Sequence, residues 1–159
     1  MTLSRVLRAD AVLVGFNPKD KWEAIRRLVE RLAEVGAFAA GAQEAVHEAL
    51  LMRERSMSTG MERGVAIPHA AVDAIDRPVA ALAILPRGVG FESIDGRPAT
   101  IVALLVIPRR EKLLHIRTLA EVARLLSRDE LRARLLSAQT PEEVLVALRA
   151  EEAKEGGAS

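Results

Sequence analysis

The chain has 159 residues, 50% hydrophobic and 28% charged, which is enough apolar material for one packed core and too little for two. Its 23 Lys and Arg residues nearly balance 22 Asp and Glu residues, so the net charge of +1 argues against nucleic acid as a partner. There is no cysteine, which excludes disulfides, thiol chemistry and cysteine-based metal sites.

The apolar runs of the sequence are short. None approaches the roughly 20 residues that cross a bilayer, and residues 1–10 do not follow the pattern of a secretory signal. We therefore expect no membrane insertion and a cytoplasmic location. Aromatic residues make up only 3% of the chain, so stacking platforms for nucleic-acid bases are missing and the core must be aliphatic.

The first half of the chain alternates between strand and helix patterns. Residues 11–16 predict a strand that ends at an Asn-Pro pair. Apolar residues three and four positions apart then predict helices over 19–35 and 42–53. The periodicity stops over 55–64, a loop with small hydroxyl residues, and the apolar run 65–68 predicts a short strand.

The second half begins with two strands and continues with helices. Residues 79–85 and 100–107 are continuous apolar runs closed by prolines, which is typical of strands buried on both faces. Helical spacing returns over 110–126, and a short helix with Leu131, Leu135 and Leu136 is predicted to follow. The last helix begins at Thr140, an N-cap followed by proline and, three residues after the cap, by glutamate.

These patterns predict one α/β domain over residues 1–150, in which helices and a sheet pack in layers. No internal repeat or long linker divides it. Residues 151–159 are charged and then small, and we expect them to form a disordered tail.

The three histidines are the first candidates for chemistry. His47 lies inside a predicted helix, and we interpret it as a surface or boundary residue. His69 follows Pro68 at the end of a short apolar run, and proline restricts the backbone that presents the imidazole. His115 lies in the first turns of a predicted helix. The structural alternatives are that His69 satisfies a loop carbonyl and that His115 is a partly buried helix residue.

A neutral imidazole can act as a nucleophile toward a phosphoryl donor near pH 7. The phosphoryl group would then need hydrogen-bond donors. Arg53 offers a guanidinium that can donate two hydrogen bonds, and Ser58, Thr59 and the backbone around Gly60 offer shorter donors. These residue types lie within one short segment before His69, which makes phosphoryl transfer the leading hypothesis.

Other chemistries lack their sequence patterns. No HxH or HExxH pair supports a metal site. The chain also has no GxSxG elbow, no Walker loop and no dinucleotide-binding fingerprint. The sequence therefore favours neither a metal site nor a hydrolase.

One segment carries a family resemblance. Its motif consists of Arg53-Glu54, Ser58-Thr59-Gly60 and the sequence GVAIPH over 64–69. It resembles the signature of IIA domains of the fructose/mannitol class in the bacterial phosphoenolpyruvate:sugar phosphotransferase system, most of all the stand-alone nitrogen-regulatory IIA proteins. The resemblance extends over about residues 3–150.

The resemblance implies both a fold and a set of roles. The fold is a mixed sheet of about five strands with helices on both faces. His69 would accept the phosphoryl group from an HPr-like phosphocarrier, Arg53 would bind the group, and His115 would lie beside the active imidazole. Members of the family need no metal or organic cofactor.

This sequence departs from the family pattern near the motif. Glu62 and Arg63 stand where a Gly-Asn pair is usual, and Ala70 stands where glycine is common after the active histidine. We expect these changes to affect partner choice and phosphorylation rate, and, if glycine at position 70 serves a positive φ, stability as well.

Two functions from different classes follow, and a third ranks below them. In the first, the chain regulates other proteins through its phosphorylation state, which the lack of a fused IIB, HPr or membrane segment favours. Alternatively it passes the group to a cysteine of a IIB domain in sugar transport. The third is a binding module of the same fold that is not phosphorylated.

Overall fold

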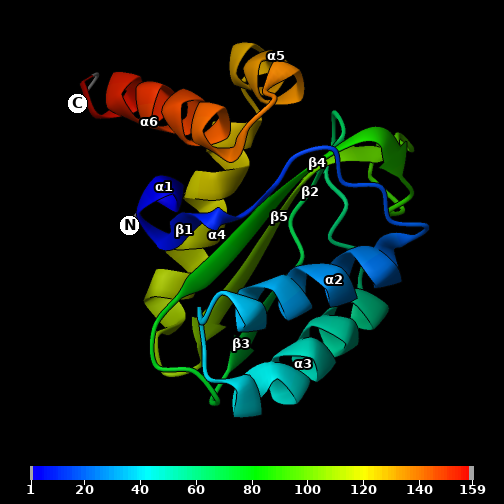
Figure 1. Cartoon of the computed structure of the whole chain (residues 1–159), viewed down its shortest axis with the longest axis vertical. Helices are drawn as coiled ribbons and strands as arrows, with labels where there is room; N and C mark the ends of the chain where they lie inside the picture. The colour runs from blue at the N-terminus through cyan, green and yellow to red at the C-terminus, as the bar shows by residue number, and fades with distance from the viewer. Residues whose placement is uncertain (1, 158–159) are drawn as a thin grey trace.

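The computed structural model describes residues 2–157 as one five-stranded sheet with helices on both faces (Figure 1). The strands are β1 (Leu7–Leu13), β2 (Val65–Ala66), β3 (His69–Val72), β4 (Val79–Val89) and β5 (Ala99–Pro108). The helices are α1 (Leu3–Val6), α2 (Lys21–Glu34), α3 (Gln43–Ser56), α4 (Lys112–Leu126), α5 (Asp129–Ser137) and α6 (Pro141–Gly157), with a 3-10 helix, η1 (Ala40–Ala42).

The sheet is mixed, as the resemblance implies. β4 and β5 form an antiparallel pair at its centre, β1 lies parallel to β4, and β2 and β3 both lie parallel to β5. Because β5 pairs with β4 on one side, β2 and β3 share its other side, where β3 pairs from His69↔Leu105 to Val72↔Pro108. The second of the two short strands on this side of β5 therefore begins at His69.

Two apolar cores fill the space between the sheet and its helices. One lies under α2 and α3 and contains Ile25, Leu28 and Leu50. The other lies under α1, α4, α5 and α6 and contains Leu126, Leu135 and Leu148. The continuous apolar runs of β4 and β5 supply side chains to both cores, because successive residues of a strand point to opposite faces.

Two strand predictions needed correction, and one short helix was not predicted. The first strand runs from Leu7 to Leu13 rather than 11–16, because the half-exposed residues 8–10 of this edge strand hide the apolar pattern. The predicted strand 65–68 is only two residues long, and a separate strand follows from His69. The helix Leu3–Val6 is a single turn without helical periodicity, which the sequence does not predict.

The last helix begins as predicted and ends later. The Thr140 hydroxyl accepts a hydrogen bond from the Glu143 backbone N–H at 3.2 Å, and the Glu143 carboxylate accepts one from the Gln139 N–H at 2.7 Å. The expected disordered tail does not begin at residue 151, because the helix continues to Gly157. Glu151 is buried and lies 3.5 Å from the Arg128 guanidinium. Residues 158–159 lie outside the described part of the chain.

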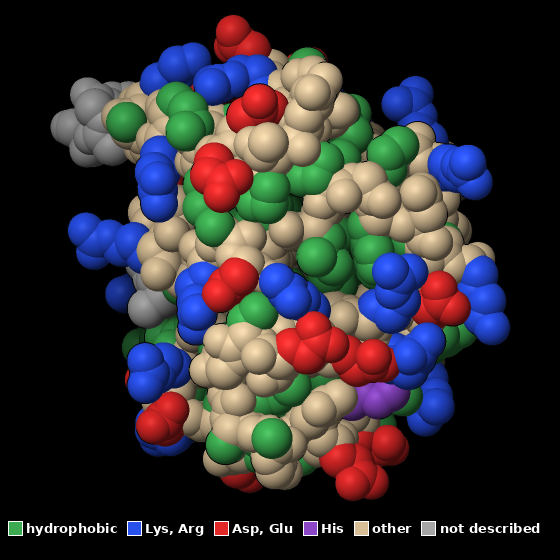
Figure 2. All heavy atoms as spheres, viewed as in Figure 1, with side chains coloured by type: hydrophobic (Ala, Val, Ile, Leu, Met, Phe, Trp, Pro, Cys, Tyr) green, Lys and Arg blue, Asp and Glu red, His purple; other side chains and the backbone are tan. Residues whose placement is uncertain are grey.

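Charged side chains of both signs are interspersed over the side of the molecule that Figure 2 shows. This distribution fits the net charge of +1. Among residues 2–157, the search for a helix with the length and apolarity of a membrane span found none.

Candidate phosphoryl-transfer site

His69 is the first residue of β3, and its ring orientation is set by its own backbone neighbourhood. The Nδ1 atom lies 2.8 Å from the Ile67 carbonyl oxygen. Because a carbonyl only accepts hydrogen bonds, this contact assigns the ring hydrogen to Nδ1 and leaves the lone pair on Nε2. The segment before the ring is also fixed, since the Ile67 N–H donates to the Thr59 carbonyl at 3.0 Å and the Leu105 N–H donates to the Pro68 carbonyl at 2.9 Å.

His115 lies in the first turn of α4 and meets His69 edge to plane. The two ring centroids are 5.5 Å apart, with an angle of 71° between the planes. The Nε2 atom of His115 is buried and has no hydrogen-bond partner among the described residues. The structure thus brings together the two histidines that the sequence analysis singled out.

Arg53, in the last turn of α3, completes the cluster. Its Nη1 donates to the Met57 carbonyl at 2.7 Å, and its charge acts on both imidazoles. Burial lowers the pKa of His69, and the charges of Arg53 and His115 lower it further, against the raising effect of the bond to Ile67. Burial and then Arg53 lower the pKa of His115. Both rings are therefore neutral at pH 7, which leaves the Nε2 lone pair of His69 available.

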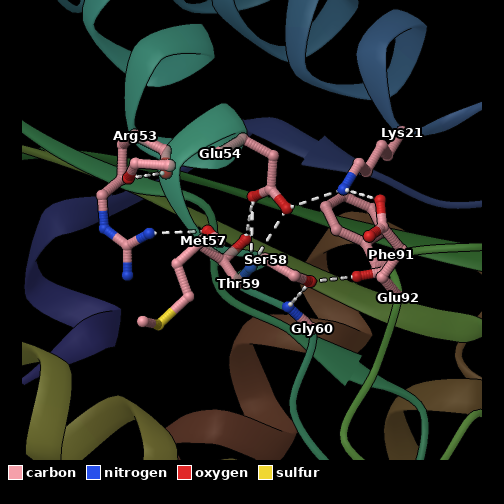
Figure 3. A network of polar contacts seen from close by, with 10 residues as sticks. Lys21, Arg53, Glu54, Met57, Ser58, Thr59, Gly60, Phe91 and Glu92 are labelled. Atoms are coloured by element: carbon pink, nitrogen blue, oxygen red, sulfur yellow. Dashed lines mark hydrogen bonds and ion pairs between the residues drawn. The ribbon is translucent and has the colours of Figure 1, made fainter.

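Ser58, Thr59 and Gly60 lie beside this cluster, but their polar groups are already used within the protein (Figure 3). The Ser58 hydroxyl donates to the Phe91 carbonyl and accepts from the Gly60 N–H at 3.1 Å. The Thr59 hydroxyl donates to the Glu54 carboxylate. Either hydroxyl would have to exchange these bonds to donate to a phosphoryl group, so in this structure both side chains support the loop.

The family of this protein follows from a match over nearly the whole sequence. The family described as "Phosphoenolpyruvate-dependent sugar phosphotransferase system, EIIA 2" matches residues 5–151. The chain belongs to this family. As an EIIA domain it is a component of a phosphotransferase system, and its mixed α/β fold is the fold of that family.

Relatives of this EIIA domain include both regulators and transport proteins. A nitrogen regulatory protein of Bradyrhizobium diazoefficiens is 33% identical over 136 residues, which are 85% of this chain and 86% of that protein. The fructose-specific EIIABC component of Bacillus subtilis is 30% identical over 145 residues, 91% of this chain. The EIIA chain spans only 22% of that relative's length.

A solved structure has the same fold. The crystal structure of the nitrogen regulatory protein IIA-Ntr from Neisseria meningitidis superposes with a TM-score of 0.83 at 25% identity. The match covers 92% of this chain and 98% of that one.

Three polar residues beside the candidate site were not predicted as site residues. Lys21, Glu54 and Glu92 form a network behind the loop 58–60, in which Lys21 contacts both carboxylates (Figure 3). Glu54 belongs to the Arg53-Glu54 motif, which was the only signal for it. Lys21 and Glu92 lie on distant segments, so no local pattern could have paired them.

The residues that depart from the family pattern are accommodated in different ways. Arg63 adopts a positive φ of 61°, and its N–H donates to the Asp95 carboxylate at 2.8 Å. Its guanidinium lies 3.5 Å from Asp129, so its charge is used at the start of α5. Glu62 is exposed. Ala70 is buried in β3 without a positive φ, so the position does not require glycine for its backbone.

Exposed apolar side chains occur on the segments that carry Arg53 and His115. Met57, Leu113 and Ile116 are 68%, 69% and 65% exposed. Met61, in the loop before β2, is half-buried, and Val65 belongs to the core under α4. An apolar surface on these segments suits contact with another protein.

His47 lies on α3, half-buried, as expected for a boundary residue, and takes no part in the cluster. Among the described residues, no group of three or more His, Cys, Asp or Glu side chains is arranged to hold a metal ion.

Proposed function

We propose that this EIIA domain is a phosphocarrier whose His69 Nε2 accepts a phosphoryl group from the phosphohistidine of an HPr-like protein. The observation that carries the proposal is the hydrogen bond from His69 Nδ1 to the Ile67 carbonyl, which leaves Nε2 as the nucleophile. The neighbouring His115 ring and the Arg53 guanidinium support it, because both can donate to phosphoryl oxygens.

The transfer step needs no proton movement. The Nε2 lone pair of His69 forms a bond to phosphorus, and the donor's N–P bond breaks with its electron pair returning to the donor imidazole. The hydrogen stays on Nδ1, which keeps donating to the Ile67 carbonyl. The step therefore depends on positioning and on the groups that face the phosphoryl charge.

The new negative charge has a nearby cation. Arg53 now donates to the Met57 carbonyl, and turning the guanidinium toward His69 would exchange this neutral acceptor for phosphoryl oxygens. Hydrogen bonds between charged groups are about twice as strong as those between neutral groups, so the exchange favours the phosphorylated form.

For the step after phosphorylation we propose a regulatory role. The nitrogen regulatory relative supports it, because that protein matches over most of its own length. Transfer to a cysteine of a IIB domain is the second candidate, and the fructose-specific relative supports it. Incubating the phosphorylated protein with IIB domains separates the two, since a transport component loses its phosphoryl group to the cysteine.

Intact-mass measurement tests phosphorylation itself. Incubation with phosphoenolpyruvate, the general enzyme of the system and HPr is expected to add the mass of one phosphoryl group to the wild-type chain and none to His69→Ala. A wild-type chain that gains no mass would leave the non-phosphorylated binding module as the function. A fully phosphorylated His69→Ala variant would show that another residue is the acceptor.

A further inference from the structure

We propose that Lys21 is a positioning residue of the phosphoryl site, acting through Glu54, Thr59 and Ile67 to hold the His69 ring in its reactive orientation. The inference rests on the proposed function for its importance, but the ring orientation that it concerns can be measured without any phosphoryl transfer. Nothing in the sequence motif points to Lys21, which lies far along the chain from His69.

Lys21 is a buried cation between two carboxylates. It is the first residue of α2 and is only 5% exposed. Its Nζ lies 3.1 Å from a Glu54 carboxylate oxygen and 2.8 Å from a Glu92 carboxylate oxygen. Burial by itself lowers the pKa of Lys21, but the bonds to Glu92 and Glu54 raise the pKa above its ordinary value. The ammonium is therefore charged at neutral pH.

Glu54 joins this cation to the loop that precedes His69. The carboxylate is 3% exposed and accepts from Lys21 Nζ, from the Thr59 N–H at 3.0 Å and from the Thr59 hydroxyl (Figure 3). Burying a carboxylate is unfavourable unless it is paired and hydrogen-bonded. Lys21 forms an ion pair with Glu54 at 3.1 Å, so the buried carboxylate that accepts from Thr59 has a cation beside it.

Thr59 passes the restraint to the active imidazole. Its N–H and hydroxyl are held by Glu54, and its carbonyl accepts the Ile67 N–H at 3.0 Å. The Ile67 carbonyl in turn accepts from His69 Nδ1 at 2.8 Å. Each bond fixes the peptide or side chain that makes the next one. A change at Lys21 thus reaches the ring through contacts that are all present in the structure.

The consequence concerns which ring nitrogen carries the hydrogen. In a neutral histidine this is set by the hydrogen bond that the other nitrogen makes. If Ile67 turns away, the hydrogen can move to Nε2 and the lone pair to Nδ1. Lys21 then matters for the fraction of molecules in which the lone pair of His69 is on Nε2.

Glu92 provides an internal contrast. It contacts Lys21 as closely as Glu54 does, but its side chain is exposed, and the carboxylate that holds Thr59 belongs to Glu54. Removing its charge with Glu92→Gln leaves the Lys21–Glu54–Thr59 connection in place. We therefore expect a smaller effect on the ring from Glu92→Gln than from changes at Lys21 or Glu54.

The test is the tautomer of His69 in the full chain, measured by ¹⁵N NMR of the imidazole at neutral pH. The wild type and Lys21→Arg are expected to carry the hydrogen on Nδ1. Lys21→Met is expected to shift the population toward the form with hydrogen on Nε2. It is also expected to slow phosphorylation by about tenfold to 100-fold, because a reacting group that is misplaced by about 1 Å loses up to about 100-fold in rate. Arg26→Gln, which breaks ion pairs on the exposed side of the same helix, is the matched control and keeps wild-type values.

Lys21→Met leaves a buried carboxylate unpaired, so the variant could fail to fold. A second variant keeps the test valid in that case. Glu54→Gln leaves no lone buried charge, because Lys21 keeps Glu92, but a single amide oxygen cannot accept from Lys21 and from both Thr59 donors. It is expected to shift the tautomer in the same direction. Folded Lys21→Met, or folded Glu54→Gln, with a wild-type tautomer would overturn the proposal.

The two proposals fail in different ways. A wild-type chain that carries hydrogen on Nδ1 but gains no phosphoryl mass would contradict the phosphocarrier function and would not affect the positioning role of Lys21. Normal phosphorylation of Lys21→Met and Glu54→Gln, with unchanged His69 tautomers, would contradict the positioning role of Lys21 and would not affect the phosphocarrier function.

Discussion

The two imidazoles of the site are close neighbours with different environments. His69 has one nitrogen held by a backbone carbonyl, whereas His115 has a buried nitrogen with no partner in the described structure. A fixed tautomer suits a nucleophile, and an uncommitted nitrogen suits a group that forms its bond only when a ligand arrives. Arg53 differs from both because it carries a full charge.

Single substitutions should separate these roles. Arg53→Ala is expected to slow phosphorylation by about 10- to 100-fold, because a charged hydrogen bond contributes about 1.5–3 kcal/mol. His115→Ala is expected to slow it by about 10-fold, because one hydrogen bond from a neutral ring to the phosphoryl anion contributes about 1.5 kcal/mol, the low end for bonds to charged groups, whereas Arg53 adds a full charge. The measurement is the initial rate of phosphoryl gain by mass spectrometry. A larger loss in His115→Ala than in Arg53→Ala would contradict this ranking.

Among the elements, α6 has a larger structural role than its sequence suggests. Its last turns carry Glu151, which pairs with Arg128, and Glu152, which accepts from the Ser4 N–H at 3.1 Å. These contacts attach α6 to α1 and to the segment before α5. The charged end of the chain thus closes the helical layer on one face of the sheet.

Deleting residues 151–159 should therefore destabilise the domain. The loss of the Glu151 and Glu152 contacts is expected to lower the free energy of unfolding by about 1–3 kcal/mol, measured by urea denaturation. Deleting only residues 158–159 is the control and should leave the value unchanged. An equal stability of both truncated chains would support the tail that the composition predicts from residue 151.

Elements with long periodic patterns were predictable, and short or tertiary features were not. The helices α2, α3 and α4 follow from apolar spacing, and the start of α6 follows from Thr140, because these signals are local. β3 was missed because two of its residues are alanines and a proline precedes it.

The candidate site was predictable in the same uneven way. Arg53 and His69 lie in one motif, and His115 was a candidate by residue type. Their convergence, however, depends on how α3, α4 and β3 pack. The Lys21–Glu54 contact joins residues 33 positions apart, and only the folded chain reveals it.

At the scale of the whole molecule, the two neutral imidazoles make stability depend on pH. Burial lowers the pKa of His69 and of His115 below the ordinary value of 6.5. Below pH 6.5 the unfolded chain therefore binds more protons than the folded chain, so the free energy of unfolding falls as the pH decreases toward the folded pKa values.

Urea denaturation between pH 7.5 and 5 measures this effect. The wild type should lose stability over that range, and the double variant His69→Gln/His115→Gln should lose less. Carboxyl groups with a lowered pKa, such as Asp95, contribute losses only at more acidic pH, because their ordinary value is already 3.8. The same slope in both proteins would show that the histidines are not the cause.

The site takes its parts from both sides of the sheet. Arg53 belongs to the helical layer of α2 and α3, His115 belongs to the layer of α1, α4, α5 and α6, and His69 stands on the strand between them. Because the three side chains come from two helical layers and the strand between them, the site forms only when both layers pack on the sheet.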